Sequence, residues 1–246
     1  MDRYFSDELF HFVGRSRPGD HEHNYRVLKK ILSEGCIAHK GPEAGSNSGW
    51  GVTSVRVDWS KTLVSQELID PTIICVCDIP LEHLGMHLEK YSPFGLSLSK
   101  QLLIKHGARP VFYVPLSTSD KGSPFGQQML LNVDQAYRGF HEHVVRRTER
   151  PRSRIHVIGS RPKSAKDAIA AVDAILAKDF LAFIKPFDSA LGPDHQDNYY
   201  AEREWRKYGN QLFKPQDVRH IVVGHGYRRR FRREMPAFAA TKVVEK

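Results

Sequence analysis

The stretch from residue 73 to residue 99 constrains the fold of this 246-residue chain more than any other part. Residues 73–77 are an apolar, β-branched run of strand length, which ends at Asp78 before a proline. Leucines at helical spacing predict a short helix over residues 81–90, and the alternation in residues 94–98 predicts a second strand. Strand, helix and strand together place polar side chains around one turn, which predicts the wall of a pocket.

Periodicity predicts further elements on both sides of this stretch. An amphipathic helix is expected after Asn24 as its N-cap, and Gly35 is placed to end it. Other expected helices cover residues 100–106, 125–145 and 165–178, and other expected strands cover 9–14, 111–114, 154–158, 180–187 and 218–223. Without a repeat or a low-complexity linker, these elements favour one α+β domain over residues 1–246, with a mixed, mostly antiparallel sheet flanked by helices. We expect a variable basic insertion at about 115–165 and a basic C-terminal tail at about 227–246.

Composition favours a cytoplasmic protein without a membrane span. No run approaches the roughly 18 apolar residues of a transmembrane helix, and the N-terminus is acidic and polar, unlike a secretory signal. The three cysteines, Cys36, Cys75 and Cys77, are few and odd in number, as expected in a reducing compartment. Cys75 and Cys77 share one face of the expected strand, where small buried thiols are a simpler interpretation than a metal pair.

The net charge of +9 is concentrated in two segments, Arg146–Lys166 and Arg228–Arg233. Such segments bind the phosphates of nucleic acid or of a dinucleotide. They are equally consistent with a surface that contacts an acidic partner protein, or with a surface that contacts only solvent. The sequence leaves these alternatives open.

Residues 202–206, Glu-Arg-Glu-Trp-Arg, form the sharpest local pattern. In an extended segment, Glu202 and Glu204 point to one side and can stabilise positive charge that develops on a sugar carbon. In a helix, Glu202 and Arg206 are only an i, i+4 ion pair. Both conformations remain open at this level.

The histidines are weaker candidates. His83 and His87 lie i, i+4 on the expected helix, a spacing that binds zinc when a third ligand exists. A metal-dependent nuclease that uses these two residues and Asp78 is a distant alternative, and we predict no metal site. His11 lies between apolar residues of the first strand, where a core histidine bonded to the backbone is the simpler interpretation.

Six separated blocks occur in one order along the chain, namely residues 9–14 (Leu-Phe-His-Phe-Val-Gly), 24–37, 75–80 (Cys-Val-Cys-Asp-Ile-Pro), 87–95, 105–113 and 198–206. In this order they resemble the AbiGi family of bacterial abortive-infection proteins, the antitoxin partners of nucleotidyltransferase-like toxins. The resemblance covers most of the chain except roughly residues 115–180. It implies a role in phage defence within a two-gene toxin–antitoxin system.

A weaker resemblance suggests a chemistry. The order of four elements is similar to the order of motifs in ADP-ribosyltransferases. These elements are a strand with His, a helix ending in Gly, a strand with Tyr and Ser, and a Glu-x-Glu strand. The resemblance implies NAD as cofactor, with His11 on the NAD ribose, Glu204 as the catalytic glutamate and Glu202 orienting the acceptor. The candidate cofactor-binding hydroxyls, which are otherwise structural, are Tyr91, Ser97 and Tyr113. The chain lacks a clear Ser-Thr-Ser element of that family.

Two functions of different classes follow. One is transfer of ADP-ribose from NAD to a protein or nucleic-acid acceptor, with Glu204 stabilising the ribosyl cation. The other is a non-catalytic antitoxin that binds and restrains a partner toxin or its promoter. In the second, the basic segments are the contact surface and Glu204 is the ion-pair partner of an arginine.

Overall fold

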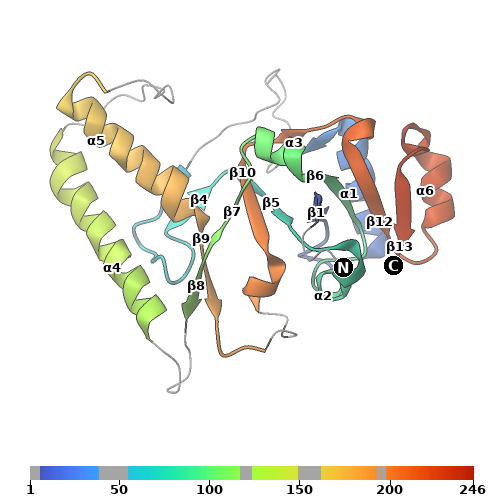
Figure 1. Cartoon of the computed structure of the whole chain (residues 1–246), viewed down its shortest axis with the longest axis horizontal. Coiled ribbons are helices and arrows are strands. Elements are labelled where there is room, and N and C mark those ends of the chain that lie inside the picture. Colours follow the sequence, from blue (N-terminus) through green and yellow to red (C-terminus); the bar gives the residue numbers. More distant parts are fainter. Residues whose placement is uncertain (1–5, 39–54, 117–123, 149–161, 193–194, 196–197) are drawn as a thin grey trace. The chain divides into compact units, whose positions relative to one another are not determined.

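A computed structural model describes residues 6–38, 55–116, 124–148, 162–192, 195 and 198–246 (Figure 1). The chain separates into two compact units, each made of more than one segment. The first unit holds residues 1–53, 72–111 and 193–246, and the second holds residues 54–71 and 112–192. The strand predicted over residues 154–158 lies outside the described residues.

A seven-stranded sheet with the order β13-β12-β6-β1-β5-β10-β7 is the framework of the first unit. Its strands are β1 (Glu8–Phe12), β5 (Ile73–Cys77), β6 (Gly95–Ser99), β7 (Arg109–Pro110), β10 (Glu204–Tyr208), β12 (Val218–Val223) and β13 (Lys242–Glu245). All neighbouring strands are antiparallel except β12 and β13, which are parallel. Strands β2 (Cys36–Ile37) and β11 (Gln211–Leu212) form a separate antiparallel pair. The predicted α+β class with a mostly antiparallel sheet is confirmed.

Four short to medium helices belong to this unit: α1 (His21–Glu34), α2 (Gly85–Lys90), α3 (Lys100–Lys105) and α6 (Arg228–Glu234). Helix α1 begins earlier than predicted, because Asp20 rather than Asn24 caps it and accepts the His23 N–H at 3.0 Å. Gly35 ends the helix as predicted. It adopts φ 61°, the left-handed conformation that glycine reaches at least cost.

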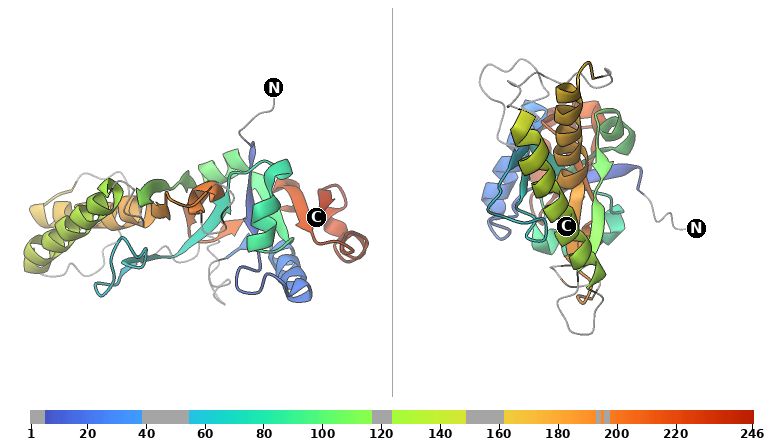
Figure 2. Two further views of the ribbon diagram at one scale, coloured as in Figure 1. Left: turned by 90° about the horizontal axis from the view of Figure 1, so that it is seen from below. Right: turned by 90° about the vertical axis from the view of Figure 1, so that its left-hand side faces the viewer.

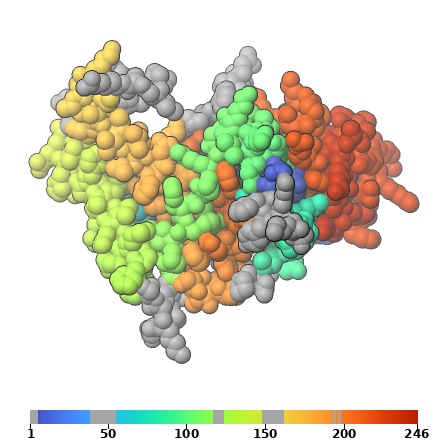
Figure 3. All heavy atoms as spheres, viewed as in Figure 1, coloured from blue at the N-terminus to red at the C-terminus, as the bar shows by residue number. Residues whose placement is uncertain are grey.

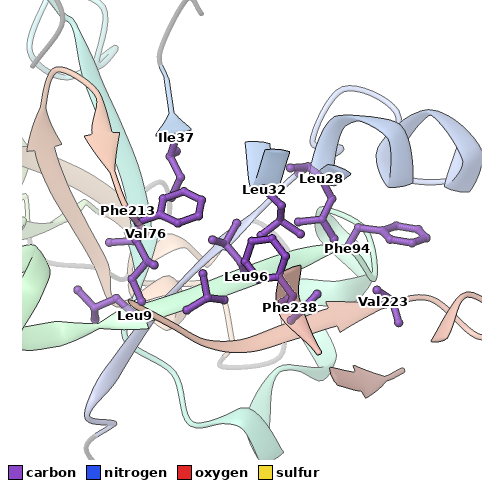
Figure 4. Close-up of a cluster of buried hydrophobic side chains, with 14 of the residues drawn as sticks. Leu9, Leu28, Leu32, Ile37, Val76, Phe94, Leu96, Phe213, Val223 and Phe238 are labelled. Carbon is purple, nitrogen blue, oxygen red and sulfur yellow. The ribbon is translucent and has the colours of Figure 1, made fainter. Parts of the chain in front are cut away.

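The two faces of the sheet are covered by different helices. On the α1 face, Leu9, Val76 and Leu96 pack with side chains of α1 in the main core (Figure 4). On the opposite face, which we call the α2 face, Phe10 and Cys77 pack in a smaller cluster against the segment that leads into α2. Because side chains alternate along a strand, this assignment also gives the faces of the remaining residues of β1, β5 and β6, and of the residues of β10 that pair with β5.

The second unit contains two long helical runs. Helix α4 (Phe125–Phe140) continues as a π-helix (His141–Val145) and a 3-10 helix (Arg146–Thr148), and α5 (Ala165–Ala174) continues as a π-helix (Ile175–Phe180) and a 3-10 helix (Leu181–Phe183). Figure 2 shows α4 and α5 side by side, and the Tyr137 hydroxyl donates to Asp173 across them at 3.1 Å.

Four short strands complete the second unit. Strands β3 (Val55–Val57) and β4 (Ile69–Pro71) pair antiparallel, and β8 (Phe112–Leu116) and β9 (Ile184–Asp188) pair parallel. The strand predicted over residues 180–187 was wrong in its first half, because residues 180–183 continue the helical run and only the second half pairs with β8.

Candidate functional site

The two candidate carboxylates do not lie on one strand or on one helix. Glu202 ends a 3-10 helix (Tyr199–Glu202), and Glu204 is the first residue of β10. Arg203 separates them in the left-handed conformation, with φ 45° and ψ 51°. This turn breaks the alternation that would place both carboxylates on one side of a strand. It equally rules out a helical ion pair between Glu202 and Arg206.

Glu202 is buried in a small polar cluster. Its Oε1 accepts from Lys90 Nζ at 2.7 Å and from the Tyr91 hydroxyl at 3.2 Å. Burial, and then the charge of Glu202, raises the pKa of the Tyr91 phenol, so this hydroxyl keeps its proton and acts as a donor. Of the predicted site residues, the structure therefore brings Tyr91 and Glu202 together.

Glu204 forms a close ion pair with an arginine on its own strand. Arg206 Nε lies 2.6 Å from Glu204 Oε1, and the two side chains are only 14% and 7% exposed, respectively. Residues i and i+2 of a strand share a face, and Glu204 stands opposite Cys77 in the sheet. The pair therefore lies on the α2 face.

His11 lies on the other face of the same sheet. It stands opposite Leu96, one residue beyond Phe10, so its ring projects on the α1 face. Its Nδ1 donates to the Cys75 carbonyl at 3.0 Å. Burial lowers the pKa of His11, and this hydrogen bond only partly opposes the shift. His11 and Glu204 are thus not brought together, and His11 is bonded to the backbone as the simpler interpretation predicted.

Ser97 belongs to a different polar cluster on the α2 face. Its buried hydroxyl donates to the Glu8 carboxylate and accepts the His220 N–H at 2.9 Å. The His220 ring closes the cluster, with Nδ1 2.8 Å from Glu8 Oε2. Sequence reasoning did not identify Glu8 or His220. The only signal was their polarity at alternate positions of two apolar strands, which does not reveal that β1 and β12 both flank β6.

The remaining predicted hydroxyl, Tyr113, is on β8 in the second unit. Its ring meets Phe187 edge-on with 6.1 Å between centroids. Tyr113 therefore belongs to a different unit from Glu202 and Glu204.

His87 is a buried histidine of the first unit with a strongly shifted pKa. It is 5% exposed and packs against the rings of Phe12 and Tyr91. Among the residues that the structure describes, neither of its ring nitrogens has a hydrogen-bond partner, and burial lowers the pKa of His87 to about 4. His83, in contrast, is exposed in the 3-10 helix that precedes α2. Within the described residues, no group of three or more His, Cys, Asp and Glu side chains is arranged to hold a metal ion.

The second basic segment forms α6, and its arginines have two distinct environments. Arg230 makes a bidentate pair with Glu22 and also binds Glu234, while Arg232 donates to three backbone carbonyls. Arg228, Arg229 and Arg233 are exposed. The first basic segment is described only at its ends, because residues 149–161 lie outside the described part.

Comparison with known proteins places the chain in a family. Residues 53–232 match the family model described as "Putative abortive phage resistance protein AbiGi, antitoxin". The chain belongs to the AbiGi family. No curated protein and no solved structure matches it. The AbiGi membership confirms the first resemblance, with its abortive-infection and antitoxin role, whereas the resemblance to ADP-ribosyltransferases has no such support. No described helix of this AbiGi protein is long and apolar enough to cross a membrane.

Proposed function

We propose that this chain is a non-catalytic antitoxin that neutralises its partner toxin in the cytoplasm by binding it. The observation that carries the proposal is the buried ion pair of Glu204 with Arg206. A carboxylate that stabilises a ribosyl cation must direct its negative charge at the sugar. Here the Arg206 guanidinium lies 2.6 Å from the carboxylate, so Glu204 already has a structural counterion.

The position of His11 supports the same conclusion. In the transferase hypothesis, His11 and Glu204 contact the same NAD molecule. In this sheet they project from opposite faces. Transfer of ADP-ribose from NAD stays a prediction, and it requires a rearrangement of the strands that hold these two residues.

A binding surface is available on α6. Arg228, Arg229 and Arg233 are exposed there, on a chain whose net charge is +9. Such a surface attracts an acidic protein and speeds its association. We propose a nucleotidyltransferase-like toxin with an acidic face as the partner. Nucleic acid, including the promoter of the toxin gene, is the competing ligand for the same arginines.

The test measures neutralisation and binding with the toxin of the same two-gene system. Arg228→Glu with Arg229→Glu should weaken toxin binding at least tenfold, because two attractive charges become repulsive. Lys105→Glu with Lys214→Glu is the matched control, since both lysines are exposed elsewhere on this unit. Equal loss in both variants, or transfer of radiolabel from NAD to the toxin by wild type, would overturn the proposal.

A further inference from the structure

Four large apolar side chains of the second unit are exposed along the α5 run and on the neighbouring strand β8. Val172 and Ile175 of the α5 run are 45% and 56% exposed, and Phe180 at the end of that run is 44% exposed. The Phe180 ring contacts Phe112 of β8, with 5.6 Å between centroids, and Phe112 is 51% exposed. We call these four residues the α5 strip. In Figure 3 the yellow-orange atoms of α5 lie on the surface that faces the viewer.

Packing among the described residues of the second unit does not explain the strip. Val172 and Ile175 are three residues apart and share one side of the helix. Helix α5 proper contains no fully buried residue, although half of its ten residues are alanine and two more are aliphatic. Single exposed apolar residues are ordinary, but a contiguous apolar patch on a protein surface marks a site of interaction.

The charges near the strip indicate the chemistry of its partner. Lys163 and Lys166 are exposed at the start of α5, and Arg146 and Arg147 are exposed at the end of the α4 run. The π-helix that leads into these arginines packs against α5, so the four cations gather at one end of the helix pair. On the described part of both runs, only Glu142 and Asp179 are fully exposed acids.

A second copy of the chain is a poor fit for this surface. Each copy would bring the same local excess of positive charge, which is part of a net charge of +9. Like charges that face each other across an interface weaken binding, whereas an acidic partner would be attracted to these cations. An apolar strip beside a cationic end matches an amphipathic segment whose polar side is acidic.

We infer that the α5 strip and its cationic end are a second docking surface for the toxin, in addition to α6, and that the toxin presents there an apolar segment bordered by acidic residues. This inference rests on the proposed antitoxin function and adds a contact on the second unit. Val172 and Ile175 supply the apolar anchors, and the lysines and arginines orient the bound toxin. Apolar anchors near the centre of an interface dominate its affinity.

The experiment titrates the purified toxin into the full chain by calorimetry. Val172→Glu with Ile175→Glu should weaken binding at least tenfold, because the variant loses apolar contact and repels acidic groups. Gln135→Glu with Ala136→Glu on exposed positions of α4 adds the same charge and should bind like wild type. Circular dichroism and thermal unfolding establish that both variants fold.

The outcomes separate this inference from the proposed function. If the strip variant binds like wild type while the α6 variant does not, the docking surface on α5 is wrong and the antitoxin function stands. If wild type does not bind the toxin, the proposed function fails and the inference falls with it. If wild type self-associates, and the strip variant is monomeric with unchanged toxin affinity, the occupant is a second copy and the inference is overturned.

Discussion

A double-mutant cycle on Glu204 and Arg206 tests whether the glutamate is structural. The two side chains meet at 2.6 Å and are 7% and 14% exposed, so bulk water screens them weakly. Charge centres about 4 Å apart at an effective dielectric of about 20 attract by roughly 4 kcal/mol. Desolvation of both groups opposes this attraction, so the net worth of the intact pair is small. Removal of one partner is different, because the remaining buried charge then loses a counterion that lay 2.6 Å away.

We therefore expect Glu204→Gln to lower the free energy of unfolding by about 3 kcal/mol, and Arg206→Met to lower it by a similar amount. The double variant should lose less than the sum, with a coupling energy of about 2 kcal/mol. Urea unfolding followed by circular dichroism gives each value, provided that the slope with denaturant is unchanged. Glu89→Gln, at an exposed glutamate on α2, is the control and should change stability by less than about 0.5 kcal/mol.

The reasoning is refuted if Glu204→Gln leaves stability within about 0.5 kcal/mol of wild type. It is equally refuted if the two single losses add without coupling. A glutamate kept for catalysis rather than for the fold would give the first result, since strained catalytic groups often reduce stability.

Three further predictions concern other parts of the first unit. The pKa of His87 is lowered from 6.5 to about 4, so the unfolded chain binds the proton more tightly than the folded chain does. The free energy of unfolding should therefore fall by about 3 kcal/mol as the pH drops from 6.5 to 4. His87→Phe should remove this pH dependence, measured by urea unfolding at several pH values. Gly35→Ala should lower the free energy of unfolding by about 2 kcal/mol, because φ is 61° and the new Cβ would lie 2.8 Å from the Phe213 carbonyl oxygen. Gly19→Ala is the control and should leave stability unchanged in the same urea melts, because a Cβ at Gly19 meets nothing within 4 Å. Ser97→Ala should lower the melting temperature through a loss of about 1–2 kcal/mol, since it leaves the partly buried Glu8 carboxylate without one donor, and an unchanged melting temperature would contradict that contact.

Local patterns predicted much of the first unit. The apolar run of β5, the strand β12 and the glycine that ends α1 are properties of a few neighbouring residues, and each was placed correctly. Residues 180–183 were misassigned, because a short aromatic and aliphatic run is compatible with a buried helix as well as a strand.

The candidate site was harder to predict, because it depends on sheet order and on single backbone conformations. The left-handed turn at Arg203 decides whether Glu202 and Glu204 share a side, and no periodicity reveals it. The register that places His11 and Glu204 on opposite faces comes from pairing between distant strands. The non-catalytic antitoxin hypothesis did anticipate one feature of the site, namely an ion pair between Glu204 and an arginine.

Calorimetric titration of the toxin into the wild-type chain, with no NAD present, tests the central claim most directly. We predict saturable binding, with the activity of the toxin falling in step with the fraction bound. An antitoxin that neutralises its toxin in cells but shows no binding in this titration would contradict the account, as would neutralisation that requires NAD.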